Sequence, residues 1–322
     1  MSGWMWMPSA PPTLAALLAV HLQPVPVLPV VAALLGVLYA TGVLRLRARG
    51  DAWPVTRSLW FAAGLLVWLA VTATGVEGYG MELFSVHMVQ HMVLGMLVPI
   101  LLVLGAPMTL LLRALPGRSP VRKGVLAVVH SRPVRVLTHP VVVSAIFFVS
   151  LYGLYFTPVF DALMRTMWGH NLMLLHFIAV GGLYFWGILR VDPTPRHSDR
   201  GIGVVGEEAV PVLELGAGVP FHAFFGVALM LSPVLLATVY AHPMASWGVS
   251  PLGDQQAAGG IAWGATELPT LLVLAVLFAQ WQRSDARRAA RSSRGAGLRR
   301  EEEELAAYNA RLAAIADHDA RA

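Results

Sequence analysis

Seven stretches of about twenty residues, each with at most one formal charge, constrain this chain more than any other feature. A helix needs about 20 apolar residues to cross the hydrocarbon core of a bilayer. The composition agrees, because 57% of the residues are hydrophobic and 13% are charged, which is about half the usual charged share. The sequence therefore predicts an all-α, polytopic membrane bundle of seven transmembrane helices. The stretches are Val25–Leu44, Ser58–Val76, Leu83–Leu112, His139–Phe160, Met167–Leu189, Val219–Ala241 and Ile261–Trp281.

The third stretch is too long for one crossing, since its 30 residues at about 1.5 Å each exceed a hydrocarbon core of about 30 Å. Pro99 can kink this helix, and the run Gly105-Ala106-Pro107 can stop it. We therefore expect Met108–Leu115 to form a short separate helix that lies along the inner membrane surface.

Basic residues predict the orientation, because cytoplasmic loops of membrane proteins are enriched in lysine and arginine. With the N-terminus outside, 22 of the 23 basic residues fall on the inner side and Arg165 alone falls outside. No basic residue precedes Arg45, so a cleaved signal peptide is not expected. The predicted organisation is an outer N-terminal segment (1–24), a transmembrane domain (25–282) and a charged cytoplasmic tail (283–322) with a short amphipathic helix.

Several function classes are excluded or unsupported. The chain has no cysteine, so thiolate metal sites and disulfides are absent, and the pI near 10 reflects arginines at the membrane rather than nucleic-acid binding. The only lysine, Lys123, falls in a predicted inner loop, which excludes retinal Schiff-base chemistry. An HExxH zinc-protease motif is also missing. We do not expect an enzyme.

The third span carries the sequence His87-Met88-Val89-Gln90-His91-Met92. At 100° per residue, His87, Gln90 and His91 share one helix face, beside a stripe of methionines that includes Met92. Histidines at i and i+4 can bind one metal ion from a single helix, and imidazole beside thioether favours copper, particularly Cu(I). The alternative is a pair of histidines that form hydrogen bonds to neighbouring helices, with the methionines as core residues.

Further candidate ligands fall in the same predicted outer half of the membrane. His170 and His176 lie on the fifth span, His242 closes the sixth, and Glu267 lies one to two turns into the seventh. Ionisable side chains inside a membrane are costly and are therefore functional candidates. The predicted metal site comprises His87, His91, Met92, His170, His176, His242 and Glu267.

Two other polar groups receive a structural interpretation. His222 is expected at the inner surface, where the sixth span would begin, as a histidine that caps a helix. Asp254-Gln255-Gln256 is expected in the outer loop before the seventh span, as an ordinary turn that caps a helix.

These segments together resemble the bacterial CtaG family of cytochrome c oxidase assembly factors, in its seven-span form. The resembling stretches are SVHMVQHMVLGMLVPILLVLGAPMTLLLRALP (85–116), LLHFIAVGGLYFWGILRVDP (174–193), PFHAFFGVALM (220–230) and DQQAAGGIAW (254–263). The positions that match the family's motifs are His87, His91, His176, His222, Asp254, Gln255 and Trp263.

The resemblance implies a protein of the bacterial cell membrane that assists production of a heme–copper oxidase and is not itself an enzyme. It implies oxidase subunits or copper donors as partners, and copper as the cargo. Two alternatives remain, a redox protein with heme b held by two histidines, and a copper permease.

Overall fold

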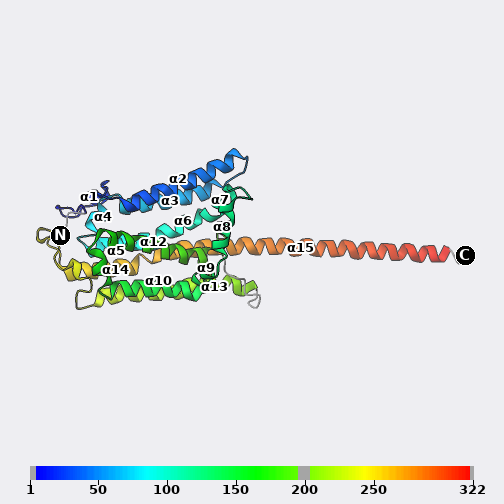
Figure 1. The fold of residues 1–322 in the computed structure, drawn as a ribbon. Coiled ribbons are helices and arrows are strands. Elements are labelled where there is room, and N and C mark those ends of the chain that lie inside the picture. The colour runs from blue at the N-terminus through cyan, green and yellow to red at the C-terminus, as the bar shows by residue number, and fades with distance from the viewer. Residues whose placement is uncertain (1–4, 195–203, 320–322) are drawn as a thin grey trace. The chain divides into compact units, whose positions relative to one another are not determined.

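A computed structural model describes residues 5–194 and 204–319, and every regular element in these ranges is a helix (Figure 1). The predicted all-α class is confirmed for this part of the chain. The chain forms two compact units, Met1–Leu274 and Ala275–Ala322. The α-helices are α1 (Leu14–Leu18), α2 (Val27–Ala48), α3 (Val55–Thr72), α4 (Gly75–Tyr79), α5 (Phe84–Met92), α6 (Val98–Leu104), α7 (Pro107–Ala114), α8 (Pro120–Val129), α9 (Arg132–Leu137), α10 (Pro140–Tyr155), α11 (Val159–Met164), α12 (Met167–Leu189), α13 (Val204–Leu231), α14 (Pro251–Gly264) and α15 (Glu267–Asp319). A π-helical turn, η1, covers Val93–Leu97, and two 3₁₀ turns, η2 and η3, cover Thr238–Tyr240 and Ala245–Trp247.

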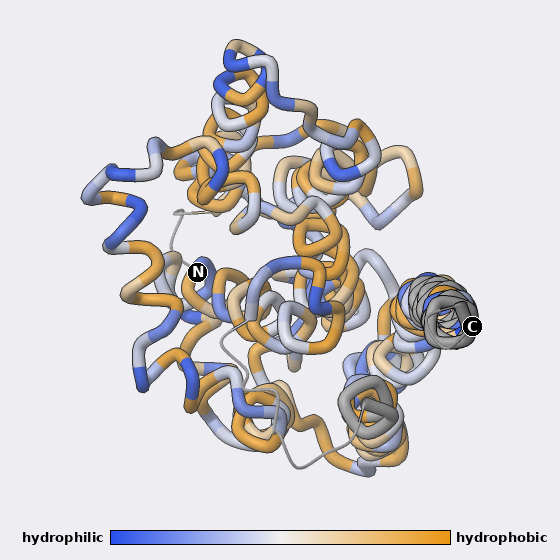
Figure 2. The backbone as a smooth tube through the Cα atoms, turned by 90° about the vertical axis from the view of Figure 1, so that its right-hand side faces the viewer, coloured by the Kyte–Doolittle hydropathy of each residue, from blue (hydrophilic) through white to orange (hydrophobic). Residues whose placement is uncertain are grey.

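Six helical segments in the described ranges are long and apolar enough to cross a membrane. They are Val27–Ala48, Val55–Thr72, Phe84–Leu104, Met167–Leu189, Val210–Leu231 and Pro251–Ala286. The predicted fourth span corresponds to α10, an apolar helix of 16 residues that is shorter than the others. Figure 2 shows hydrophobic residues along these helices and hydrophilic residues mostly in the turns that join them.

The segment Phe84–Leu104 forms the centre of the bundle, since 72% of its most apolar window is buried, against 22% for Val27–Ala48. It is not one regular α-helix. Pro99 has no N–H to donate to the carbonyl of Gly95, and the π-helical turn η1 precedes it. The Gly95 carbonyl lies so close to Gly181 of α12 that a Cβ on Gly181 would approach its oxygen to 2.1 Å. Two glycines therefore bring α12 against the central helix.

The break after the central helix is confirmed. Ala106 adopts a left-handed conformation with φ 51°, and α7 (Pro107–Ala114) follows as a separate short helix. Asp192 accepts hydrogen bonds from the backbone N–H groups of Met108 (3.0 Å) and Thr109 (2.7 Å). The first turn of α7 is thus held by a carboxylate from the segment that follows α12.

The predicted sixth and seventh spans have wrong boundaries. The sixth candidate span covers Val210–Leu231 instead of Val219–Ala241; it is part of α13, which begins at Val204 and ends before Ser232-Pro233. The first half of α13 contains the acidic residues Glu207, Glu208 and Glu214, so it does not form an uncharged stretch in the sequence. The seventh candidate span covers Pro251–Ala286 instead of Ile261–Trp281, and its first part is α14, which starts at Pro251 with Ser250 as its N-cap.

The tail prediction also needs correction. A single helix, α15, runs from Glu267 to Asp319, so the expected short amphipathic helix is part of a 53-residue element. Local helix propensity explains this, because Ala, Arg, Glu and Leu dominate the tail and proline is absent from it.

The N-terminal segment packs across one end of the bundle, which is called the α1 end below and also holds α4 and the start of α14 (Figure 1). Val20 forms an isolated β-bridge with Thr74, and the His21 N–H donates to the Ala73 carbonyl over 2.9 Å. The Tyr79 hydroxyl donates to the Ala10 carbonyl over 3.1 Å. These contacts tie residues 5–24 to the turn between α3 and α5.

Candidate functional site

Helix α5 presents His87 and His91, and a distant carboxylate fixes where this helix begins. Leu83, its N-cap, offers no side-chain acceptor. Instead, Asp254 of α14 accepts hydrogen bonds from the N–H groups of Phe84 (2.5 Å) and Ser85 (3.2 Å). A negative side chain at this position also interacts favourably with the helix dipole. Asp254 therefore positions the histidine-bearing helix, and it lies within α14 rather than in the expected loop.

The neighbouring Gln255 performs the corresponding role at the end of α13. Its side-chain amide donates to the carbonyls of Val234 (3.0 Å) and Leu229 (3.4 Å), and its oxygen accepts from the Leu236 N–H (2.7 Å). Gln255 is fully buried. These bonds satisfy backbone groups that the end of a helix leaves unpaired, and they hold α13 against α14.

His87 lies near the start of α5 and is fully buried. Its Nε2 and the Tyr155 hydroxyl are 3.1 Å apart, whereas its Nδ1 has no hydrogen-bond partner among the described residues. The ring centroids of His87 and His170 are 6.3 Å apart. These two histidines, from the predicted third and fifth spans, therefore lie near each other in the described structure.

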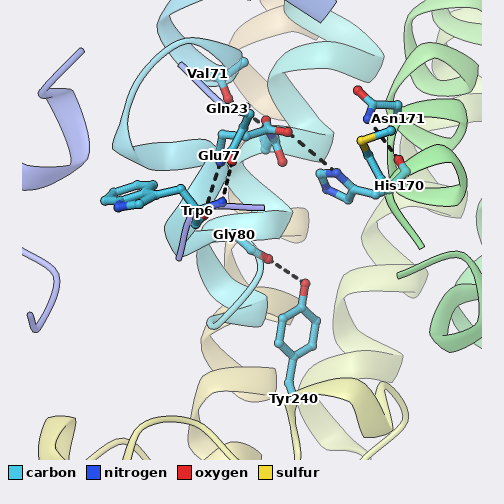
Figure 3. A network of polar contacts seen from close by, with 10 residues as sticks. Trp6, Gln23, Val71, Glu77, Gly80, His170, Asn171 and Tyr240 are labelled. Carbon is cyan, nitrogen blue, oxygen red and sulfur yellow. Dashed lines mark hydrogen bonds and ion pairs between the residues drawn. The ribbon is translucent and has the colours of Figure 1, made fainter. Parts of the chain in front are cut away.

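His170 faces Glu77 at the α1 end, where Figure 3 shows both side chains converging. The distance from His170 Nδ1 to Glu77 Oε1 is 3.6 Å, which is too long for a hydrogen bond. Glu77 also accepts a hydrogen bond from the Gln90 side-chain amide, which donates in addition to the Val71 carbonyl over 2.8 Å. Burial raises the pKa of the Glu77 carboxyl to about 8.

Three histidines from three helices line one small cavity, called the interior cavity below; His91 and His222 are buried and His176 is half-buried. The volume of this cavity is about 20 Å³, room for the centre of one water-sized molecule. His91 Nδ1 and His222 Nε2 are buried without a hydrogen-bond partner in the described structure. Met96 is the thioether in the same wall.

The interfacial interpretation of His222 is wrong. The side chain is 2% exposed and lies well inside α13, because that helix begins at Val204 instead of near Val219. Close packing of α13 against α14 accompanies the burial of His222. A Cβ on Gly226, one turn along α13, would lie 2.7 Å from the Gly259 carbonyl oxygen of α14, so only glycine permits this approach.

The remaining predicted ligands lie elsewhere. His242 is exposed between η2 and η3, and Glu267 is exposed in the first turn of α15. The expected contact of Glu267 with the histidines is therefore not formed, and Glu77 is the carboxylate that reaches them. Met92 is buried but lines neither cavity that contains a histidine.

The predicted donors form two groups rather than one cluster. Within the described ranges, no three side chains of the types His, Asp and Glu meet at a geometry that would hold a metal ion. One group is His91, His176 and His222 around the cavity, and the other is Glu77 with His170. His87 lies beside both. The free ring nitrogens and the nearby thioether have the donor chemistry that Cu(I) requires.

Sequence reasoning missed Glu77 and the role of Asp254. Glu77 directly follows the second apolar stretch and so falls outside every predicted span, although the residue is only 3% exposed. A lone carboxylate beside a span, followed by Gly78, is a signal that could have marked it. The contacts of Asp254 join residues about 170 positions apart and left no local signal.

Comparison with known proteins places these features in a family. Uncharacterized proteins of Mycobacterium bovis and Mycobacterium tuberculosis are each 44% identical over 280 residues, which cover 85% of this chain and 41% of theirs. An uncharacterized protein of Mycobacterium leprae is 41% identical over 291 residues, 87% of this chain and 42% of its own. The chain thus spans about two fifths of the length of these relatives. No solved structure matches it.

The family model for the cytochrome c oxidase caa3 assembly factor (CtaG) matches residues 37–284, which hold both groups of buried histidines and the capping residues Asp254 and Gln255. Because this match covers most of the chain, the protein belongs to the family of cytochrome c oxidase caa3 assembly factors.

Proposed function

We propose that this protein carries Cu(I) during the assembly of a heme–copper cytochrome c oxidase, and that His91, His222 and the Met96 thioether hold the ion in the cavity that they line with His176. Membership of the assembly-factor family supports the process. The observation that carries the copper assignment is the cavity between three helices that these imidazoles line together, with unpaired ring nitrogens on His91 and His222. The role is transfer of a cargo ion, not catalysis.

The environment of the cavity suits a reduced copper ion. Phe147, Leu151 and Phe177 complete its wall, so most of its lining is apolar. Burial in apolar surroundings disfavours charged imidazolium and keeps the ring nitrogens available as ligands. The Met96 thioether is a soft donor that favours Cu(I). These residues would bind the ion and keep it reduced without supplying a redox step.

We also propose seven membrane crossings in the cell membrane, with α10 as a short fourth crossing and the α1 end outside. The charge distribution supports this orientation, because the loop that contains α7, α8 and α9 holds six basic residues, whereas Arg165 is the only basic residue predicted outside. Copper would then enter from the outer side, where oxidase subunits or copper donors would meet the protein.

The size of the cavity disfavours the heme alternative. A porphyrin is many times larger than the single water-sized molecule for which the space among His91, His176 and His222 has room. A heme between these histidines would require the helices to move apart, although glycine contacts at Gly95–Gly181 and Gly226–Gly259 pack them closely.

The test uses His91→Ala and His222→Ala in a host whose oxidase depends on this protein. Both variants should lose oxidase activity at limiting copper, while the assembly factor itself accumulates normally. The purified variants should also retain less Cu(I). His242→Ala is the matched control, because His242 is exposed and should be dispensable. Full oxidase activity in the double variant His91→Ala/His222→Ala would overturn the assignment.

A further inference from the structure

Glu77 is a buried acidic residue whose carboxyl group has few hydrogen-bond donors around it and could bind a cation. Asp192 and Asp254, also buried, each accept hydrogen bonds from backbone N–H groups at the start of a helix. Within the described residues, Glu77 accepts no hydrogen bond from a backbone N–H group and instead accepts one from the neutral side-chain amide of Gln90. A buried carboxylate is costly unless it meets a cation or sufficient donors, so its position requires an explanation.

His170 provides the second unsatisfied group. Its side chain is completely buried, and neither ring nitrogen has a hydrogen-bond partner in the described structure. The ring faces Glu77 over 3.6 Å (Figure 3). In a neutral imidazole one nitrogen bears a lone pair. A carboxylate oxygen and an imidazole nitrogen that converge at this distance leave space for a bridging cation.

Two thioethers adjoin the same carboxylate. Met5 and Met167 line a small cavity with Glu77, beside the amide side chains of Gln23 and Asn171. Its volume is about 10 Å³, which suits one small ion or one water molecule. Met5 comes from the N-terminal segment and Met167 from the start of α12, so the cavity lies at the α1 end of the bundle.

We propose that Glu77 and His170, with the thioethers of Met167 and Met5, form a second cation site that receives Cu(I) before it reaches the interior cavity. This inference rests on the proposed function. The Glu77 carboxyl releases its proton when a cation binds, and the resulting carboxylate offsets the charge of a monovalent cation, which the neutral imidazoles of the interior do not. Imidazole and thioether donors select a soft ion over the hard cations that a carboxylate alone would attract.

The arrangement of the histidines links the two sites. The ring of His87 is 6.3 Å from that of His170, and His91 follows His87 by one helical turn. His91 borders the interior cavity with His176 and His222. The imidazoles thus form a series that leads from Glu77 at the α1 end to the centre of the bundle.

The experiment is an anaerobic titration of the full-length, detergent-purified protein with Cu(I), in competition with a chromogenic Cu(I) chelator. We expect two Cu(I) per chain in the wild type and one in Glu77→Gln, which keeps the shape of the side chain and removes its charge. Met167→Leu should weaken one of the two sites at least tenfold. The matched controls Glu82→Gln and Met164→Leu, neither of which lines the cavity, should still bind two.

The outcomes separate this site from the proposed function. If the wild type binds one Cu(I) that His222→Ala removes, and Glu77→Gln and Met167→Leu retain it, the second site is wrong and the interior site stands. If Glu77→Gln removes the one bound ion and His222→Ala does not, the second site stands and the interior assignment fails. A wild type that binds no Cu(I) overturns both. Thermal unfolding of each variant checks its fold, and Met167→Leu decides if Glu77→Gln fails to fold.

Discussion

Replacement of Asp254 by alanine should loosen the helix that carries the histidines. The carboxylate accepts from the N–H groups of Phe84 and Ser85 over 2.5 and 3.2 Å, and the side chain of Leu83 cannot replace it. A hydrogen bond to a charged acceptor contributes about 1.5–3 kcal/mol. Two such bonds, less the desolvation cost that alanine no longer bears, leave a loss of about 3 kcal/mol. This corresponds to roughly a hundredfold change in an equilibrium constant.

Amide hydrogen exchange in detergent micelles measures this effect at the two donors. In Asp254→Ala, the N–H groups of Phe84 and Ser85 should exchange about a hundredfold faster, because local opening no longer breaks bonds to a carboxylate. The midpoint of unfolding in denaturing detergent should also fall. Asp254→Asn keeps one acceptor oxygen and should show a smaller change in both measurements.

Asp161→Ala is the control for a carboxylate that caps a more exposed segment. Asp161 accepts from the N–H groups of Thr238 (3.2 Å) and Val239 (3.1 Å) at the turn η2. Its loss should cost about 1 kcal/mol or less and leave exchange in α5 unchanged. Unaltered protection of Phe84 and Ser85 in Asp254→Ala, with an unaltered unfolding midpoint, would refute the argument that this carboxylate holds α5.

Two further predictions concern packing and topology. Gly181→Val should strongly reduce the amount of folded protein extracted from membranes, because a Cβ there would lie 2.1 Å from the Gly95 carbonyl oxygen. The control Gly182→Ala should accumulate like the wild type in the same assay, because a Cβ at Gly182 meets open space. Reporter tags fused before Met1 and after Ala322 should show opposite sides of the membrane, outside and inside, and tags on the same side would contradict the arginine-based orientation.

The sequence alone determined the features that depend on local pattern. Runs of apolar residues predicted most of the long helices, and Met167–Leu189 has the predicted boundaries. Gly105-Ala106-Pro107 marked a helix end, because proline cannot continue a helix and the residue before it must leave the helical conformation. Helical periodicity placed His87 and His91 on one buried face. Hydropathy, turn chemistry and periodicity act over a few residues, so a single sequence contains them.

Only the tertiary structure decided which polar groups meet. His222 joined the interior cavity because α13 begins earlier than its charge pattern indicated. Glu77, rather than Glu267, reached a histidine, because the turn between α3 and α5 folds inward whereas the first turn of α15 is exposed. Asp254 caps a helix about 170 residues away. Such contacts depend on how helices pack and rotate against one another, and close packing through glycine sets that geometry without a periodic trace in the sequence.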